Sequence, residues 1–345
     1  MPDVANYAYM NTRVSILAEQ LLNHEQRQQL LDSESEHADN ILRQAGVDLD
    51  AINTPLDSNL LEQSLISTLV QEACILTRSM TAPGKAFINH WMYRFELINL
   101  KLLLRIKFTQ LPVTDLQTRL IDLGPLAAIP VDRLLATEDI TEFLRQLESS
   151  PYKAMAMQAR QVYEEKQSLF DVESVLDSHY YQVLHRLSNV LTREHRQVTK
   201  RLLGVLLDQV NLSWLLRLRF SFHLNAPHVY FLLAPGGHNL GMPVLLELAQ
   251  QETLEQVLQK LPEPLASRLA EATSISSVEF SMGELAQNTA QLALRTTSFN
   301  LGRAFAYLYL REQQMQLMHS TIKARLLGLG HEIISGSIFA EGEAA

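Results

Sequence analysis

Residues 99–108 read Asn-Leu-Lys-Leu-Leu-Leu-Arg-Ile-Lys-Phe, and residues 211–220 read Asn-Leu-Ser-Trp-Leu-Leu-Arg-Leu-Arg-Phe. Both follow the pattern N-L-x-x-L-L-R-x-[K/R]-F, with an offset of 112 residues between Asn99 and Asn211. A match of this length in one register indicates two copies of one helical unit. Repeated helical units bury their apolar faces against each other and form shaped surfaces for partners, without needing an active site.

An apolar stripe runs along each copy of the repeated phrase. At 100° per residue, three leucines of each copy fall on one arc, which is typical of a helix face packed into a core. The leucines that we expect in the core are Leu100, Leu103 and Leu104 in the first copy and Leu212, Leu215 and Leu216 in the second.

The basic residues of the phrase occupy two different positions on the helix. Arg105 and Arg217 point away from the apolar arc, so we predict that they contact other units or partner proteins. Lys107 and Arg219 lie inside the arc, late in each helix. Two interpretations of these cations are open: they extend to solvent near a helix C-terminus, where the dipole favours positive charge, or they pair with a carboxylate of another unit.

The last long helix carries an acidic residue within its apolar stripe. This residue is Glu312, and a carboxylate that is buried needs a partner. We hypothesise that Glu312 pairs with a cation, either at an interface between units or on a neighbouring protein. The stripe around it consists of Phe305, Leu308, Met315, Met318 and Ile322.

Length and composition predict an all-α protein of two or three units. The chain has 345 residues, of which 47% are hydrophobic, with only 13 Gly and 12 Pro, a balance that favours helices over strands. Boundaries near 118 and 235 give three units, 1–118, 119–235 and 236–345, each built around a long helix near its end.

The pattern of apolar and punctuating residues predicts the individual elements. A short extended run ending in a turn is expected at 229–233, with a helix end as the alternative, and a loop is expected in the Ser-rich stretch 273–283. Apolar periodicity predicts the long helices at about 85–108, 152–191, 198–222 and 289–327.

The charge balance limits the classes of partner. A net charge of −9, from 29 basic and 38 acidic residues, argues against a general nucleic-acid binder and against direct adhesion to anionic lipid, although a local basic face could still exist. The single cysteine, Cys74, excludes an internal disulfide and fits a reducing cytosol. We see no secretory signal at Met1–Val4 and no run of about 18 apolar residues, so we expect a chain that does not cross a membrane itself.

The sequence predicts no catalytic, cofactor-binding or metal-binding residue. There is no HExxH motif, and His331-Glu332 lacks the second histidine that a helical zinc site requires. The loop at 235–238, Pro-Gly-Gly-His, lacks the Lys-Ser/Thr of a phosphate-binding loop. No GxSxG nucleophile motif occurs, so nothing in the sequence points to an enzyme.

Several passages, taken in order, resemble one family. Between about residues 7 and 330 the chain is similar to the C subunit of bacterial and archaeal V/A-type (vacuolar/archaeal-type) ATPases, the counterpart of the d subunit of the eukaryotic V-ATPase. Two departures from the family pattern are Gln314, where an acidic residue is common, and a third unit without the Asn-Leu phrase. The passages that carry the resemblance are 9–14, 99–107, 176–181, 211–219, 231–237 and 310–314.

The resemblance implies a fold and a role. The family fold is an all-α funnel of three units with pseudo-threefold symmetry. It caps the membrane proteolipid ring on the cytoplasmic side and accepts the central shaft in its cavity. The implied protein is a non-catalytic member of the central stalk, cytoplasmic and peripheral to the membrane, which passes rotation between the ATPase head and the ring. Its partners are the ring and the shaft subunits, with no cofactor, nucleic acid or small-molecule substrate.

Two other interpretations stay open. A generic all-helical scaffold or regulatory adaptor would share the repeats but have no affinity for a proteolipid ring. An all-α enzyme with a site hidden between units would require a deep polar pocket with paired titratable groups.

Overall fold

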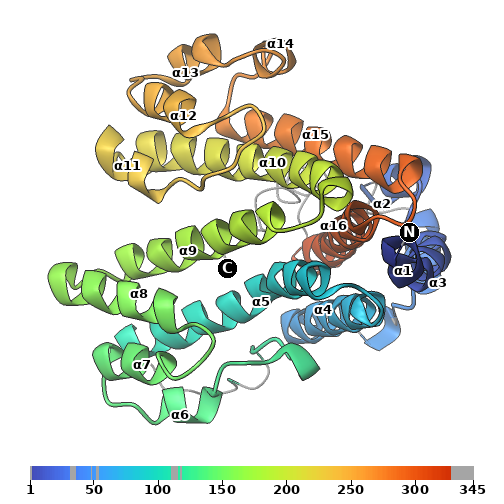
Figure 1. Cartoon of the computed structure of the whole chain (residues 1–345), viewed down its shortest axis with the longest axis horizontal. Coiled ribbons are helices and arrows are strands. Elements are labelled where there is room, and N and C mark those ends of the chain that lie inside the picture. The colour runs from blue at the N-terminus through green and yellow to red at the C-terminus, as the bar shows by residue number, and fades with distance from the viewer. Residues whose placement is uncertain are drawn as a thin grey trace.

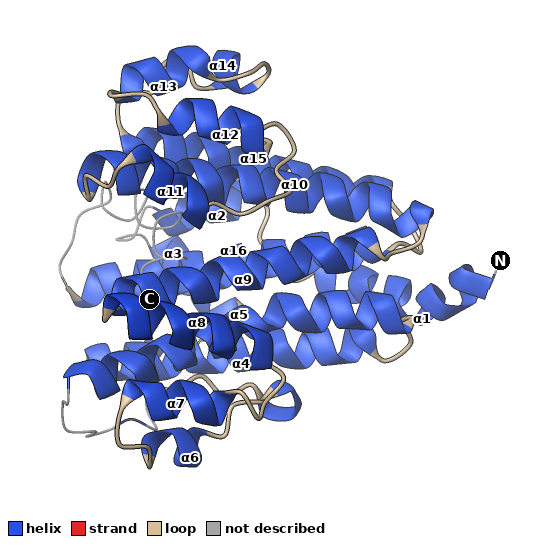
Figure 2. Cartoon of the chain, turned by 60° about the vertical axis from the view of Figure 1, so that its left-hand side comes forward, coloured by secondary structure: helices blue, strands red, loops and turns tan. Residues whose placement is uncertain are grey.

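The structure is a computed structural model, and it describes residues 2–31, 36–47, 49–51, 54–109, 116 and 119–327 (Figure 1). Every regular element in these ranges is a helix or a helical turn (Figure 2), which confirms the all-α fold class. Among the described helices, none combines the length and apolar character that a membrane crossing requires.

Six long helices form the body of the molecule, and they come as three antiparallel hairpins. The second helix of each hairpin packs along the first helix of another: α5 against α9, α10 against α15, and α16 against α4. The connections within the hairpins lie at the same end of the body in both views, on the right (Figures 1 and 2). The hairpins are α4 (Pro55–Thr77) with α5 (Ala82–Thr109), α9 (Leu169–Asn189) with α10 (Arg193–Leu216), and α15 (Ile275–Thr296) with α16 (Leu301–Leu326).

Shorter helices cover this body. One group precedes the first hairpin, and the others connect the second helix of one hairpin to the first helix of the next. They are α1 (Pro2–Ala18), α2 (His24–Leu31), α3 (Glu36–Gln44), α6 (Val131–Leu135), α7 (Ile140–Leu147), α8 (Lys153–Lys166), α11 (Ala226–Leu232), α12 (Met242–Ala249), α13 (Leu254–Lys260) and α14 (Leu265–Arg268).

The leucine stripe of the repeated phrase is buried as predicted. All six leucines are at most 1% exposed. The last helix, α16, is the most enclosed of the long helices: it contacts α1, α2, α4, α10 and α15, and Phe305 and Tyr307 are fully buried in it. The edge-on packing of Phe305 against Phe87 and Trp91 joins α16 to α5.

Some predicted elements are confirmed and others need correction. The helix predicted at 85–108 is α5. The helix predicted at 152–191 is two helices, because Gln167 adopts a left-handed conformation (φ 50°) that ends α8. The helix predicted at 198–222 begins earlier, at Arg193, and its last turn, Arg217–Ser221, is π-helical.

Capping residues decide the local structure at three further places. Of the two possibilities at 229–233, the helix end is the one observed: the run lies mostly in α11, since Asn225 accepts a hydrogen bond from the His228 N–H (2.9 Å) and starts a helix. The loop predicted at 273–283 belongs to α15, which Ser274 begins with a capping box. The single helix predicted at 289–327 is interrupted before Asn300, which caps α16.

Candidate functional site

The asparagines of the repeated phrase make the same contact twice. Asn99 donates to the Ile121 carbonyl and accepts from the Ile121 N–H, both at 2.8 Å. Asn211 forms the same two hydrogen bonds with Ala234: it donates to the Ala234 carbonyl at 2.8 Å and accepts from the Ala234 N–H at 2.7 Å. Both asparagines are buried, so each side chain satisfies backbone groups that could not otherwise reach water. In each copy, the long helix is thereby fastened to the chain segment that follows it.

The arginines of the phrase are also equivalent in the structure. Arg105 forms a two-pronged ion pair with Glu173, at 2.7 and 2.9 Å, and Arg217 forms one with Glu279, at 2.7 and 2.8 Å. Each glutamate is the fifth residue of its helix, α9 or α15. These paired arginines therefore join each long helix to the next hairpin, a geometry that planar guanidinium groups favour.

Lys107 and Arg219 donate to backbone carbonyls. Lys107 Nζ lies 2.7 Å from the carbonyl of Leu135, the last residue of α6, and also bonds that of Thr137. Arg219 donates to the carbonyls of Leu224 (2.6 Å) and Gln251 (3.1 Å), the latter just after α12. Among the described residues neither cation has a carboxylate partner; each stabilises unpaired carbonyls at the end of a short helix.

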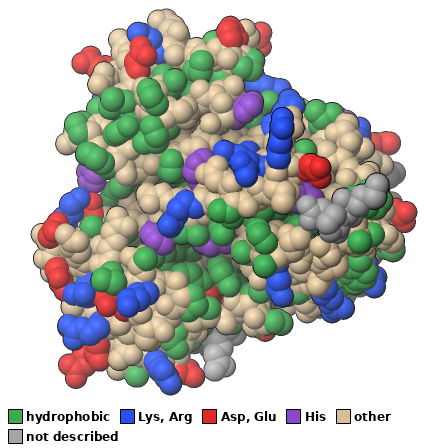
Figure 3. All heavy atoms as spheres, in the orientation of Figure 1, with side chains coloured by type: hydrophobic (Ala, Val, Ile, Leu, Met, Phe, Trp, Pro, Cys, Tyr) green, Lys and Arg blue, Asp and Glu red, His purple; other side chains and the backbone are tan. Residues whose placement is uncertain are grey.

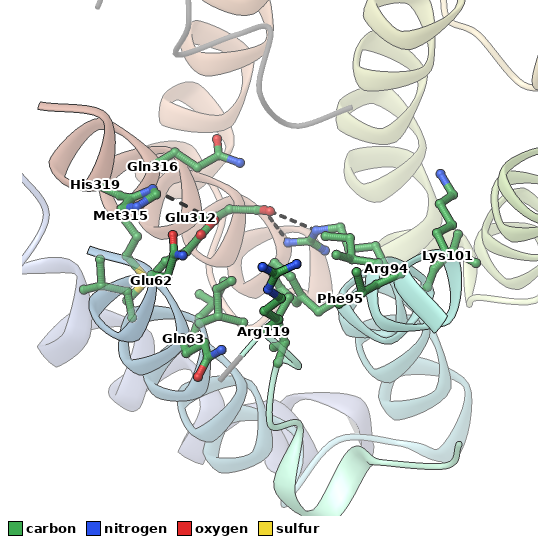
Figure 4. Close-up of a pocket in the computed structure, with 18 of the residues that line it drawn as sticks. Glu62, Gln63, Arg94, Phe95, Lys101, Arg119, Glu312, Met315, Gln316 and His319 are labelled. Atoms are coloured by element: carbon green, nitrogen blue, oxygen red, sulfur yellow. Dashed lines mark hydrogen bonds and ion pairs between the residues drawn. The ribbon is translucent and has the colours of Figure 1, made fainter. Parts of the chain in front are cut away.

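A cavity of about 420 Å³ lies between α4, α5, α9, α10 and α16. Its wall is apolar over much of its area, with charged side chains along two sides (Figure 4). In the close-up, Arg94 from α5 and Glu312 from α16 point toward each other, whereas Glu62, Gln63 and His319 lie on the far side.

Glu312 pairs with Arg94. Arg94 Nε lies 2.9 Å from Glu312 Oε1, and its Nη2 bonds Oε2. The guanidinium also lies over the rings of Trp91 and Phe95, 4.0 and 4.5 Å from their centroids. Burial raises the pKa of Glu312 above its ordinary value, and the positive charge of Arg94 opposes that shift. The buried carboxylate thus has its cation within the chain.

Two further polar pairs line the cavity. Lys101 Nζ lies 2.6 Å from Asp177, where burial raises the pKa of the carboxyl and the lysine lowers it. On the other side His319 Nε2 lies 3.0 Å from Ser58 Oγ, and His319 Nδ1 lies 3.9 Å from Glu62. Ser58 is only 1% exposed, so this serine–histidine pair is not presented to a substrate.

The arrangement fits docking better than bond chemistry. The charged pairs of the wall neutralise each other, and they leave an apolar recess between long helices. Within the described residues, no group of three His, Cys, Asp or Glu side chains could hold a metal ion; His331 and Glu332 lie outside those residues. Concave, largely apolar recesses of this kind are the usual binding sites of proteins.

Sequence reasoning missed Arg94, Lys101 and Asp177. A signal for two of them was available. Arg94, Lys101 and Arg105 are spaced by seven and four residues, which places them on one face of α5. That spacing marks a line of cations facing the cavity, but the sequence does not show which carboxylates on other helices pair with them.

Comparison with known proteins agrees with this architecture. The profile of the ATP synthase (C/AC39) subunit family matches residues 10–335. Three proteins named as the C subunit of an A-type ATP synthase are similar along most of their length. The one from Methanosphaera stadtmanae is 23% identical, over 90% of this chain and 81% of its own. The one from Methanothermobacter thermautotrophicus is 24% identical (91% and 82%), and that from Methanocaldococcus jannaschii 21% (96% and 86%).

The family profile spans all three hairpins, both copies of the repeated phrase and the residues that line the cavity. The chain therefore belongs to the ATP synthase (C/AC39) subunit family.

Proposed function

We propose that this chain is a non-catalytic central-stalk subunit of a rotary V/A-type ATPase or ATP synthase. It couples the rotor shaft to the proteolipid ring of the membrane sector. Membership of the C/AC39 family supports the assignment, as do relatives named as the C subunit of an A-type ATP synthase. The observation that carries it is the set of ion pairs that join long helices of different hairpins: α5 to α16, α5 to α9, and α10 to α15.

Rigidity is what a coupler must supply. A torque applied at the cavity reaches the rest of the body only if the long helices do not slide past one another. The Arg105–Glu173, Arg217–Glu279 and Arg94–Glu312 pairs oppose such sliding, because a two-pronged contact fixes direction as well as distance. The recess, lined by Leu65 and Leu69 on one side, receives side chains at the tip of the shaft.

The same proposal covers the organisation of the chain and its place in the cell. Three pseudo-symmetric units fit the recurrence of the asparagine and arginine contacts, although the predicted boundary near 118 lies outside the described residues. A protein with this role sits at the cytoplasmic face of the membrane and is held there by the complex. It has no substrate or cofactor of its own.

Cross-linking tests the shaft contact. In a chain carrying Cys74→Ala, Gln63→Cys places a thiol in the cavity wall, and Glu255→Cys places one on exposed α13 as the control. After attachment of a photoreactive maleimide and reassembly of the complex, we expect a cross-link to a shaft protein from position 63 alone. Equal labelling from both positions would reject the assignment of the cavity to the shaft.

Purification tests the assembly itself. The tagged chain, recovered from detergent-solubilised membranes, should carry proteolipid and shaft subunits with it. A generic scaffold or regulatory adaptor, the alternative function, would be recovered with neither.

A further inference from the structure

The charges of this acidic chain are unevenly distributed. Three stretches surround the turns of the hairpins: 73–95, 178–207 and 285–311. They hold eleven of the 29 Lys and Arg residues but one of the 38 Asp and Glu residues, Glu194. Two of the eleven cations, Arg94 and Arg311, pair with Glu312 and Glu72, which lie just outside these stretches. Because the three turns lie at one end of the body (Figures 1 and 2), the other nine give this end, here called the hairpin end, an excess of positive charge in a chain that is acidic as a whole.

Most of the cations at the hairpin end are exposed. None of the exposed ones forms an ion pair with another described residue, although Arg196 donates to the Leu191 carbonyl at 3.0 and 2.7 Å. Figure 3 shows Lys and Arg side chains gathered over α9 and α10 on the viewed face. The exposed cations are Arg78, Lys85, Arg186, Arg193, Arg196, Arg201 and Arg295.

Two of these cations stand where they disfavour folding. Arg193 is the first residue of α10, and Lys85 is the fourth residue of α5. The N-terminus of a helix carries partial positive charge, so a cation there is repelled. Removing these two charges should therefore not weaken their helices.

The three turns form one continuous surface. Tyr7 of α1 bonds Thr81 in the first turn (3.1 Å) and packs its ring 4.2 Å from that of His195, at the start of α10. Asn300 in the third turn donates to the Glu194 carbonyl at 2.9 Å. A partner would therefore meet the three turns as a rigid unit.

An aromatic side chain projects from this surface in a constrained conformation. Phe299, in the third turn, has φ 54° and is 41% exposed. A bulky residue in the left-handed region is strained. Asn11 of α1 holds the turn, because its Oδ1 accepts from the Phe299 N–H at 3.0 Å and also from Arg303. Val190, in the second turn, adds a 63% exposed apolar side chain to the same cationic surface.

We propose that the hairpin end docks onto an acidic protein surface, with Phe299 as its apolar anchor. Exposed arginines and a fixed aromatic side chain on one surface are the composition of an energetic centre in a protein interface. The inference rests on the proposed function in one respect: it takes the acidic partner to be another protein of the same complex.

A folded partner suits these features better than a bilayer does. Lipid headgroups adapt to any side-chain conformation, so holding Phe299 in a strained turn would not improve binding to a bilayer. It would improve binding to a preformed protein pocket, because a preorganised anchor binds without the entropic cost of ordering. The net charge of −9 would also repel the chain as a whole from an anionic membrane. A folded protein, in contrast, is able to present an acidic surface to the hairpin end without approaching the acidic remainder of the chain.

Two variants separate binding from folding. Lys85→Gln/Arg193→Gln removes cations that the dipoles of α5 and α10 repel, and Phe299→Gly removes a ring from a backbone that glycine adopts without strain. Both should melt at the temperature of the wild type or above it. The matched controls are Arg133→Gln/Lys153→Gln and Phe231→Ala, which change exposed residues on α6, α8 and α11.

Binding is measured with the full chain. The probes are the detergent-purified membrane sector, the purified shaft subunits, and protein-free vesicles of anionic phospholipid, each at salt concentrations from about 50 to about 300 mM NaCl. We expect each hairpin-end variant to weaken binding to one of the two protein probes about tenfold or more. The Lys85→Gln/Arg193→Gln variant should also reduce the dependence of the affinity on salt, and the controls should bind as the wild type does.

The outcomes distinguish this inference from the proposed function. If both hairpin-end variants bind the protein probes as tightly as the wild type, the inference is wrong and the proposed function stands. If the wild type binds vesicles as well as it binds the membrane sector, the surface is a lipid site and the inference is again wrong. If the wild type binds neither protein probe, the proposed function itself fails.

Discussion

Arg94 and Glu312 face each other across the wall of the cavity with 218 residues of chain between them, and Arg94 Nε lies 2.9 Å from Glu312 Oε1. Their side chains are 17% and 10% exposed. A pair so far from water is stable only while both charges are present. It ties the last long helix to the first hairpin, and it does so beside the recess that we assign to the shaft.

Glu312→Gln should destabilise the chain, because it leaves the Arg94 guanidinium buried without a counter-charge. We expect the free energy of unfolding, measured with urea, to fall by about 3–5 kcal/mol, and assembly into the complex to weaken. Glu284→Gln, on the exposed face of α15, is the control and should change little. Replacing both partners, as Arg94→Met/Glu312→Leu, should cost less than the sum of the single changes; additive losses would show that the two residues are not coupled.

The two arginines of the repeated phrase should differ in their importance. Arg217→Ala leaves Glu279, whose side chain is 5% exposed, without its counter-charge, and should cost about 3 kcal/mol or more. Arg105 is 44% exposed, so solvent screens its pair, and Arg105→Ala should cost about 1 kcal/mol or less. Urea unfolding of both variants measures the two losses of stability. Equal losses would mean that the exposure of these pairs does not control their strength.

Asn99→Asp and Asn211→Asp test the backbone contacts. Each change keeps the size of the side chain but removes the Nδ2 donor, so the carbonyl of Ile121 or Ala234 loses its partner and a carboxylate is placed in a buried site. We expect each to lower the free energy of unfolding by about 1–3 kcal/mol or more. Asn288→Asp, on the exposed face of α15, should stay close to the wild type. A neutral result at both buried positions would contradict the proposed role of the phrase in fastening its helix.

His90 should make stability depend on pH. Burial lowers its pKa from 6.5 to about 4, with smaller contributions from His179 and Arg186 of α9, while its Nε2 donates to the Tyr180 carbonyl at 3.0 Å. The unfolded chain therefore binds a proton that the folded chain excludes. Stability from this group is fully present above pH 6.5 and is lost as the pH falls toward 4, by about 3 kcal/mol in all.

Comparison of His90→Gln with the wild type isolates this contribution. Glutamine is able to donate to the same carbonyl but does not titrate, so the variant should lose less stability than the wild type between pH 6.5 and about 4. His24→Gln, at an exposed position, should follow the wild-type curve. If the stability of His90→Gln and that of the wild type depended on pH in the same way, His90 would not be the source of the pH dependence.

Features that depend on residues close in the sequence, such as helix positions and buried leucines, could be predicted. Contacts between residues far apart in the sequence could not. Apolar periodicity was sufficient to predict α5 and the leucines that both copies of the phrase bury. It failed at 273–283, where the side chain of Ser274 initiates a helix that hydrophobicity alone does not reveal.

The partners of Glu312, Lys107 and Arg219 could not be predicted from the sequence for a different reason. The position of Glu312 on its helix predicted that it would need a cation, but not which one. The choice of Arg94 follows from the packing of α16 beside α5, which no local pattern encodes. For Lys107 and Arg219 the residue types suggested carboxylates or solvent, whereas the unpaired carbonyls that they bond exist only because α6 and α12 end nearby.

The burial of α16 also has a consequence for biosynthesis. It is the last described helix to be made, yet it fills the space between helices from both earlier hairpins and α1. Until residues 301–326 leave the ribosome, the apolar surfaces that will enclose Phe305 and Tyr307 have nothing to cover them. Nascent chains of this protein are therefore exposed to aggregation until late in translation, and a ribosome stalled before α16 would release a polypeptide that depends on chaperones.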